Sequence, residues 1–292
     1  ALNGVSEIAA EYTSDQPVRR LMDLAMKLEG LPRHSSTHAA GVVIGAQPLI
    51  EVVPLQQKGA DAEVVTQFSM KNVEALGLLK VDFLGLRNLD VIDKAVALVG
   101  AGLDIAQIPM DDRKTYEMLA RADSTGVFQF ESSGMRDALR AVKPTVFEDL
   151  IALVALYRPG PMQYIPTYAA RKNGKEQVVY IDERLKPITG DSYGICVYQE
   201  QYMQIAKQLA GFEPAEAETL RIGKKIHELM ASLKPKFLDG CAANGVTPAV
   251  ADQLWKDMES SQDYSFNKAH AACYALIAYR TAWLKANHPC EY

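Results

Sequence analysis

Two residues of opposite charge, Lys80 and Asp82, lie in a run of apolar residues that favours a β-strand. Because alternate side chains of a strand point to the same face, Lys80 and Asp82 are expected to share one face. Leu79, Val81 and Phe83 then point to the opposite face, towards a core. A carboxylate near the end of a strand with a cation beside it suits the binding of a divalent metal ion and a phosphate group. An ordinary surface ion pair is the alternative that this pattern leaves open.

Basic residues also recur at turns and at expected helix starts. The set comprises Arg158 in an Arg-Pro-Gly-Pro turn, Arg221, Lys224 and Lys225 around Gly223, and Asn267, Lys268 and His270 at the start of the last long helix. The N-terminus of a helix presents free N–H groups and partial positive charge, so cations placed there favour a bound anion. We therefore expect phosphate binding near residues 266–270. The alternative is that the lysines are solvated and that Asn267 only caps the helix.

Several familiar catalytic motifs are absent. His227 and Glu228 begin like the zinc-protease motif HExxH, but Ala231 stands where the second histidine is required. The lysines after Gly223 resemble the end of a P-loop, although Glu218 occupies the place of the first glycine. No GxSxG or GxGxxG sequence is present either. The common hydrolase and dinucleotide-binding functions are therefore excluded.

Two histidines, His34 and His38, are spaced so that they could meet a metal ion on one helix face. They lie where a helix is expected to give way to a strand, and no third ligand is near them in the sequence. A metal site is therefore not predicted there.

Composition sets further limits on the class of protein. The 292 residues are 48% hydrophobic and 23% charged, and 31 Lys and Arg against 36 Asp and Glu give a net charge of −5. This excludes a histone-like basic binder but not a nucleic-acid enzyme, whose basic patch is local. No long uncharged apolar run or N-terminal signal occurs, so no membrane span is expected. The four cysteines contain no CxxC pair, which indicates a reducing, cytoplasmic compartment.

The elements that must position these residues change in type along the chain. Residues 16–30 have the apolar spacing of an amphipathic helix, with Asp15 as its N-cap and Gly30 as its stop. Four β-favouring runs follow and are predicted to be strands of one sheet: 39–44, 51–55, 64–68 and 78–83. After Gly85 the chain is expected to be almost entirely helical. The predicted fold class is therefore α+β, a small sheet followed by a large helical region.

Helix 146–157 has the clearest boundary signals of the helical region. Thr145 and Glu148 fit a capping box at its start, and Arg158-Pro159-Gly160-Pro161 cannot continue it. Further helices are predicted at 89–99, 112–122, 198–210, 214–222, 226–243, 248–260 and 269–287. The first residue is alanine and the chain stops shortly after a helix-ending His-Pro pair, so we expect an internal piece of a longer protein.

Six sequence motifs, in the same order, resemble those of the C-family replicative DNA polymerases of bacteria, the DNA polymerase III alpha subunits. They are His38–Ile44, Lys80–Arg87, Gly126–Met135, Ala155–Pro161, Val197–Gln201 and Phe266–His270. The resemblance covers nearly the whole chain, and long motifs in register are far more specific than one short pattern. It implies a layout like a right hand, in which 1–37 are the end of a helical thumb, 38–87 the C-terminal half of the palm, and 88–292 the fingers. The family palm has the polymerase-beta-like nucleotidyltransferase fold.

The resemblance also implies an activity, the transfer of a nucleotide from a deoxynucleoside triphosphate to the 3′-hydroxyl of a primer during DNA replication. Family members hold two magnesium ions with three carboxylates, and Asp82 matches the third. The other two belong to an Asp-x-Asp pair that lies upstream in the family and does not occur in these 292 residues. Because one carboxylate binds Mg²⁺ weakly, we expect this piece alone to be inactive.

The same resemblance implies roles for the basic residues. Lys80 approaches the triphosphate, and Arg158 contacts a phosphate or the template. The residues expected around the incoming nucleotide are Arg221, Lys224, Lys225 and Lys268, with Asn267 and His270 close by. The implied partners are primer–template DNA, deoxynucleoside triphosphates, and other replicase subunits such as a sliding clamp and a proofreading exonuclease, which bind through regions outside this piece.

One stretch departs from the family pattern. Family members place a second basic residue and one or two others between a Leu-Arg pair and the following Ile-Gly-Lys-Lys, whereas Leu220-Arg221 here runs directly into Ile222-Gly223. Removing about two residues turns a helix by roughly 200°. Either the helix start has shifted, or Arg221 and the two lysines after Gly223 no longer converge.

Two alternatives to a polymerase fragment remain. One is a non-catalytic helical module that binds nucleic acid, derived from such a polymerase. The other is a structural scaffold, which predicts no salt-sensitive affinity for DNA. Under the polymerase hypothesis, half a palm leaves sheet edges unpaired and apolar faces uncovered, so we expect the isolated piece to be only partly stable.

Overall fold

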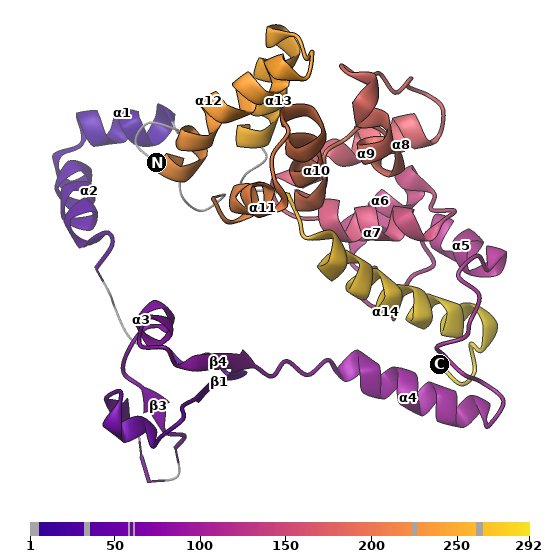
Figure 1. The fold of residues 1–292 in the computed structure, drawn as a ribbon. Helices are drawn as coiled ribbons and strands as arrows, with labels where there is room; N and C mark the ends of the chain where they lie inside the picture. The colour runs from indigo at the N-terminus through magenta and orange to yellow at the C-terminus, as the bar shows by residue number, and fades with distance from the viewer. Residues whose placement is uncertain (1–5, 32–35, 58, 61, 224–226, 261–264) are drawn as a thin grey trace. The chain divides into compact units, whose positions relative to one another are not determined.

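The chain forms two compact units, Ala1–Gly85 (unit 1) and Leu86–Tyr292 (unit 2), in a computed structural model (Figure 1). The structure describes all residues except 1–5, 32–35, 58, 61, 224–226 and 261–264. The first unit carries short strands and the second is helical, so the α+β class is confirmed. Within the described residues, no helix combines the length and the apolar character needed to cross a bilayer.

The strands of unit 1 are short and pair in twos. β1 (Gly41–Ile44) runs antiparallel to β4 (Leu79–Asp82), and β2 (Leu55–Gln56) runs antiparallel to β3 (Val65–Thr66). The described residues therefore form two separate two-stranded sheets, and the prediction of one sheet is wrong.

One of the predicted strands, 51–55, is interrupted by proline. Pro48 caps a 3₁₀ turn, η1 (Leu49–Glu51), at the start of the run predicted to be extended over 51–55. Pro54 has no N–H to donate to a ladder, and the strand β2 begins only after it. A short helix, α3 (Met70–Ala75), follows the last residues of the run predicted over 64–68.

The apolar face of β4 is uncovered. Leu79 is 59% exposed and Phe83 is 65% exposed, so the expectation that both face a core is wrong for this chain. The only buried apolar side chains among the described residues of unit 1 are Val53 and Val73. With two strands in its sheet, β4 has too little neighbouring structure to cover its apolar side. The exposed apolar side chains that we expected for half a palm are therefore observed beside β1 and β4.

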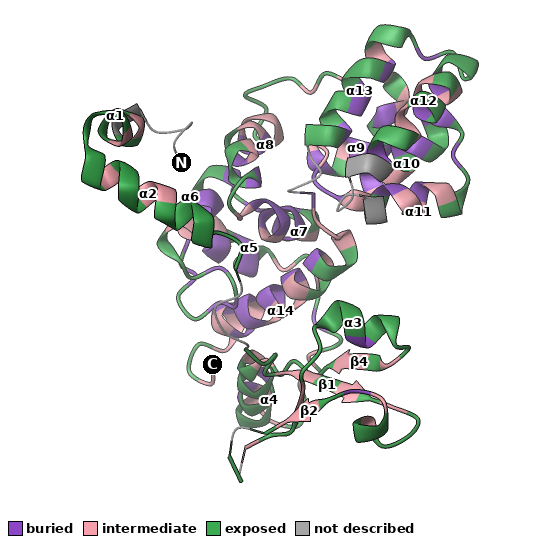
Figure 2. Ribbon diagram, turned by 90° about the vertical axis from the view of Figure 1, so that its left-hand side faces the viewer, coloured by how far each residue is buried: buried purple, intermediate pink, exposed green. Residues whose placement is uncertain are grey.

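The two N-terminal helices follow their sequence signals. Asp15 caps α2 (Gln16–Leu28) by accepting a hydrogen bond from the Val18 N–H at 3.1 Å. Gly30 adopts a φ of +82°, the left-handed conformation that ends helices. The preceding helix, α1 (Ser6–Ser14), is joined to α2 by the Tyr12 hydroxyl, which donates to Asp23 at 2.6 Å. No described residue of α2 is buried, so its apolar stripe is open to solvent (Figure 2).

Unit 2 is built from helices and short 3₁₀ turns. Its helices are α4 (Arg87–Val99), α5 (Arg113–Ala120), α6 (Ser133–Val142), α7 (Phe147–Leu156), α8 (Ile165–Lys172), α9 (Lys186–Thr189), α10 (Gln199–Ala210), α11 (Pro214–Gly223), α12 (His227–Ala243), α13 (Pro248–Ser260) and α14 (Lys268–Asn287). Its 3₁₀ turns are η2 (Pro161–Tyr164), η3 (Glu183–Leu185) and η4 (Gly190–Ser192). The predicted helices are confirmed to within about two residues at each end, whereas α6, α8 and α9 were not predicted.

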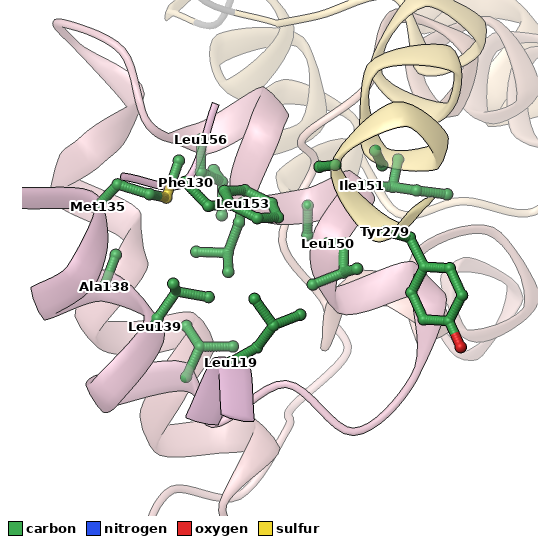
Figure 3. Close-up of a cluster of buried hydrophobic side chains, with 14 of the residues drawn as sticks. Leu119, Phe130, Met135, Ala138, Leu139, Leu150, Ile151, Leu153, Leu156 and Tyr279 are labelled. Carbon is green, nitrogen blue, oxygen red and sulfur yellow. The ribbon is translucent and has the colours of Figure 1, made fainter. Parts of the chain in front are cut away.

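The main hydrophobic core of unit 2 surrounds α7. Leu150 and Leu153 are fully buried and meet Leu119, Phe130 and other apolar side chains of α5 to α7 (Figure 3). The long helix α14 packs against α7 and closes one side of this core with small side chains. A second core lies among α10 to α13 around Phe237. These two cores position the segments that enter α10 and α14.

The cap of α7 differs from its prediction by one residue. Asp149, and not Glu148, reaches back to the chain before the helix. Its Oδ2 accepts hydrogen bonds from the N–H groups of Thr145 at 2.8 Å and Val146 at 3.2 Å. The helix still begins where it was predicted. Asp149 forms the cap because it lies on the buried face of α7, whereas Glu148 points to solvent.

Close contact between α10 and α12 depends on Gly240. A Cβ added there would lie 2.0 Å from the carbonyl oxygen of Ala210, a backbone atom that cannot move aside alone. We expect Gly240→Ala to lower the free energy of unfolding by about 2–3 kcal/mol, measured by urea denaturation. Gly190→Ala is the matched control, because Gly190 has a helical φ of −59° and open space at its Cβ position. Equal stability of the two variants would contradict the close approach of α10 and α12 at Gly240.

Candidate functional site

Lys80 and Asp82 share one face of β4, as the alternation predicted. The Lys80 ammonium donates a hydrogen bond to Oδ1 of Asp82, and Nδ1 of His38 lies 3.4 Å from the same oxygen. The antiparallel register sets this arrangement, because Gly41 of β1 lies opposite Asp82. The cluster of His38, Lys80 and Asp82 (the Asp82 cluster) is therefore built by β4 and by the segment that leads into β1.

The electrostatics of this cluster favour an ionised carboxylate. The hydrogen bond from Lys80 holds the pKa of Asp82 below its usual value, and the charges of Lys80 and His38 act in the same direction. Asp82 is half-exposed, with 44% of its side chain accessible, so an incoming cation can reach it. The carboxylate is thus a charged oxygen donor at neutral pH.

His38 was not predicted to belong to this cluster. The sequence pattern linked it to His34 as a candidate metal ligand, and His34 lies outside the described residues. The resemblance also placed His38 at the start of a family motif, without a role. Its position follows from the strand register and not from its spacing in the sequence. Gly41 lies opposite Asp82 and has no side chain to occupy the space beside His38 and Lys80. A Cβ at Gly41 would lie 2.6 Å from Nδ1 of His38 and 3.0 Å from Cε of Lys80.

The described residues do not form a complete magnesium site. Mg²⁺ requires near-octahedral coordination and usually takes one or two carboxylates together with water or phosphate oxygens. Asp82 is a suitable donor, but no group of three or more His, Cys, Asp or Glu that could hold a metal occurs in the described part of the chain. Asp82 could therefore be one ligand of a site that other carboxylates complete.

The second group of predicted residues meets in unit 2, where the segments entering α10 and α14 run side by side. Tyr198 and Phe266 form a parallel β-bridge. The N–H of Gln199 donates to the carbonyl of Phe266 at 2.9 Å, and the N–H of Phe266 donates to the carbonyl of Val197 at 3.1 Å. This bridge brings the first turn of α14 beside the first turn of α10.

The N-terminus of α14 is capped by this chain itself. Oδ1 of Asn267 accepts a hydrogen bond from the His270 N–H at 2.8 Å, so Asn267 is the N-cap. Its Nδ2 donates to Oε1 of Glu200 at 2.8 Å. The Lys268 N–H donates to both oxygens of Glu200, at 3.1 Å and 2.9 Å. A carboxylate from α10 therefore occupies the position that we expected a phosphate to take, because it satisfies the same free N–H group.

The side chain of Lys268 remains accessible. Its ammonium lies 5.3 Å from the centre of the Tyr198 ring and 3.7 Å from Oδ2 of Asp191. The Lys268 side chain is 40% exposed and that of Asp191 is 69% exposed. An exposed ion pair at this distance is weak, so an anion with more charge can replace Asp191 as the partner of Lys268.

Arg158 and His270 both lie close to the Phe266 ring. The Arg158 guanidinium is 4.2 Å from the centre of the Phe266 ring, a cation–π contact, and burial lowers its pKa. The His270 ring is nearly perpendicular to the Phe266 ring, with their centres 5.3 Å apart, and it stacks on Tyr274 at 4.5 Å. The structure thus brings together four of the predicted residues, Arg158, Asn267, Lys268 and His270, in what we call the α14-start cluster.

Arg221 lies in the last turn of α11, and its nearest partner is Glu218. Its Nε donates to Oε1 of Glu218 at 2.6 Å, and this hydrogen bond raises the pKa of Arg221. The charge of Glu200 contributes in the same direction. Lys224 and Lys225 lie outside the described residues.

Glu200, which contacts Asn267 and Lys268 of this cluster, was not predicted to be a site residue. It lies 68 residues from Lys268 in the chain, so no local spacing links the two. Its presence in a motif beside Tyr198 and Gln199 is the only sequence signal. The predicted residues therefore fall into two described groups, the Asp82 cluster in unit 1 and the α14-start cluster in unit 2.

Comparison with known protein families matches both units. Residues 1–85 match the family described as the bacterial DNA polymerase III alpha NTPase domain. Residues 88–245 match the family described as the bacterial DNA polymerase III alpha subunit finger domain. The gap between the matches coincides with the boundary between the two structural units at Gly85 and Leu86.

Individual relatives match over all or nearly all of the chain. It is 48% identical to the DNA polymerase III subunit alpha of Thermus aquaticus over 303 residues, which cover 100% of this chain and 25% of the relative. It is 46% identical to the subunit of Aquifex aeolicus, over 94% of this chain and 24% of the relative. For Chlamydia trachomatis the identity is 44%, over 100% of this chain and 24% of the relative. The chain therefore spans about a quarter of the length of these relatives.

Proposed function

The chain belongs to the bacterial DNA polymerase III alpha family, and on that premise we propose that it supplies part of the active site of a DNA-directed DNA polymerase. The reaction is nucleotidyl transfer from a deoxynucleoside triphosphate to a primer 3′-hydroxyl on template DNA. The observation that carries the proposal is the match along the entire chain, which includes the residues of both clusters. The chain alone is expected to lack activity, because it contains one of the three carboxylates of the family site.

The assignment of thumb, palm and fingers follows the two structural units. We assign 1–37 to the end of the thumb, 38–87 to the C-terminal half of a polymerase-beta-like palm, and 88–292 to the fingers. The boundary between the structural units supports the division between palm and fingers. In this assignment β1 and β4 are the part of the palm sheet that this chain contributes, and their uncovered apolar side chains receive the rest of the palm.

We assign to the Asp82 cluster the binding of magnesium and of the triphosphate. Bound magnesium neutralises the charge that develops on the attacking and leaving oxygens. Asp82 provides one ligand oxygen for it, and the other carboxylates come from an Asp-x-Asp pair outside this chain. Lys80 shares the face of Asp82 and approaches the triphosphate.

The residues of the α14-start cluster position the nucleotide. Phosphoryl transfer depends mainly on positioning and charge neutralisation, which lysine and arginine side chains provide. Lys268 contacts the triphosphate through its exposed ammonium, with Asn267 and His270 beside it. Arg221, Lys224 and Lys225 surround the same nucleotide, and Arg158 contacts a phosphate or the template.

A chimera tests this proposal, with residues 1–292 in place of the matching quarter of the Thermus aquaticus subunit. We expect the chimera to extend a primer in Mg²⁺ and the isolated chain not to. Lys268→Ala is expected to raise the KM for deoxynucleoside triphosphate at least about tenfold, since it removes one charge-assisted hydrogen bond. Lys207→Ala, which removes an exposed lysine from α10, is the matched control and should leave KM unchanged.

Two other results would point to a different function. A folded chimera that binds primer–template without extending it would favour a non-catalytic binding module. Its affinity for DNA should then fall steeply as the salt concentration rises. A chimera that extends primers with the same KM in both lysine variants would remove Lys268 from the nucleotide site.

A further inference from the structure

We infer that Glu200 is a positioning residue for the nucleotide site, which holds Lys268 where its ammonium meets the triphosphate. The inference rests on the proposed function of Lys268 and extends it to a residue of another helix. Glu200 itself does not contact the nucleotide, because its two oxygens already accept hydrogen bonds from Lys268 and Asn267.

The contacts of Glu200 fix both the backbone and the cap of α14. Its oxygens lie 3.1 Å and 2.9 Å from the Lys268 nitrogen, so the carboxylate straddles the first N–H of the helix. The third contact, from Nδ2 of Asn267 at 2.8 Å, orients the amide so that its oxygen faces the His270 N–H. The Tyr198–Phe266 bridge lies directly beside these contacts. The same segment of chain that carries Glu200 also provides the Tyr198 ring under the Lys268 ammonium.

The charge of Glu200 explains why a lysine is tolerated at this place. A cation in the first turn of a helix is unfavourable, because the N-terminal end of the helix dipole is positive. Glu200 lies in the first turn of α10 and against the first turn of α14, so one carboxylate compensates the positive ends of two helices. Without Glu200, the first turn of α14 loses a hydrogen-bond acceptor, and the backbone of Lys268 is no longer held in place.

Positioning and simple electrostatics predict opposite effects for the loss of this charge. A carboxylate near a triphosphate repels it, so removing the charge would tighten nucleotide binding if electrostatics alone mattered. If Glu200 positions Lys268, removing the charge weakens binding. Glu200→Gln in the chimera distinguishes the two, because glutamine keeps the length of the side chain and loses the charge.

The test measures KM and kcat for deoxynucleoside triphosphate. We expect Glu200→Gln to raise KM about tenfold and to change kcat less than about threefold. In combination with Lys268→Ala, Glu200→Gln should not raise KM further than Lys268→Ala alone. Both changes remove the same contact, between the Lys268 ammonium and the triphosphate. Glu148→Gln is the matched control, because it removes an exposed carboxylate from the first turn of α7.

A second variant separates positioning from folding. Glu200→Asp keeps the charge but is one methylene too short to meet both Lys268 and Asn267, and we expect it to raise KM as Glu200→Gln does. The unfolding temperature of each variant identifies any general loss of structure. An unchanged or lower KM in Glu200→Gln, or additive effects in the double variant, would overturn the inference. If Lys268→Ala itself leaves KM unchanged, the assignment of Lys268 fails, which is a different result.

Discussion

Asp82→Asn is expected to slow primer extension by the chimera at least about a thousandfold, which corresponds to roughly 4 kcal/mol of activation free energy. Asparagine has almost the same size but carries no charge, so it is a poor ligand for a divalent ion. It also leaves the Lys80 ammonium without the carboxylate that now accepts its hydrogen bond. The measurement is kcat for primer extension with saturating nucleotide in Mg²⁺, and kcat is the quantity that should decrease.

The matched control for this substitution is Asp137→Asn. Asp137 is an exposed aspartate that pairs with Arg140 at 2.7 Å, as Asp82 pairs with Lys80, but it lies in α6. We expect it to extend primers at the parent rate. Equal rates for the two asparagine variants would place the metal ligand elsewhere and remove Asp82 from the reaction.

Asp149→Ala is expected to lower the free energy of unfolding of the chain by about 3–5 kcal/mol, because it breaks a buried ion pair. Asp149 is completely buried and accepts hydrogen bonds from the Tyr168 hydroxyl at 3.1 Å and from the N–H groups before α7. The Lys172 ammonium lies 3.3 Å from its Oδ2, and that side chain is 7% exposed. Removing the carboxylate leaves a nearly buried cation and a buried hydroxyl without this acceptor.

Urea denaturation followed by the helical circular dichroism signal measures this change. Asp137→Ala provides the control, since an exposed pair contributes at most about 1 kcal/mol. If Asp149→Ala unfolds at the same urea concentration as Asp137→Ala, the buried carboxylate does not stabilise the helix start that the structure assigns to it.

The local features of the fold were predictable from the sequence. Helix starts and stops depend on residues close in the chain. The cap formed by Asp15 was predicted, and the cap formed by Asn267 was one of two alternatives that the sequence left open. The strands were less predictable, because pairing joins residues far apart in the chain. Alternation correctly placed Lys80 and Asp82 on one face, but it could not show that the opposite face of β4 lacks a covering layer.

The same distinction applies to the site. Residue types and the family motifs identified Arg158, Lys268 and Asp82 as candidates. The neighbours that orient them come from other elements, such as His38 opposite β4 and Glu200 in α10. Nothing in the spacing of either residue indicates its partner, since the contact arises from sheet register in one case and from a single β-bridge in the other.

The most direct test of the central claim is a crystal structure of the chimera with primer–template, a deoxynucleoside triphosphate and Mn²⁺ in place of Mg²⁺. We predict an anomalous peak for the metal about 2.1 Å from a carboxylate oxygen of Asp82, and the triphosphate within hydrogen-bonding distance of the Lys268 ammonium. In that complex the Asp82 carboxylate binds the metal, and the triphosphate replaces Asp191 as the partner of Lys268. A metal bound without Asp82, together with a triphosphate that does not contact Lys268, would contradict the assignment of this chain to the polymerase active site.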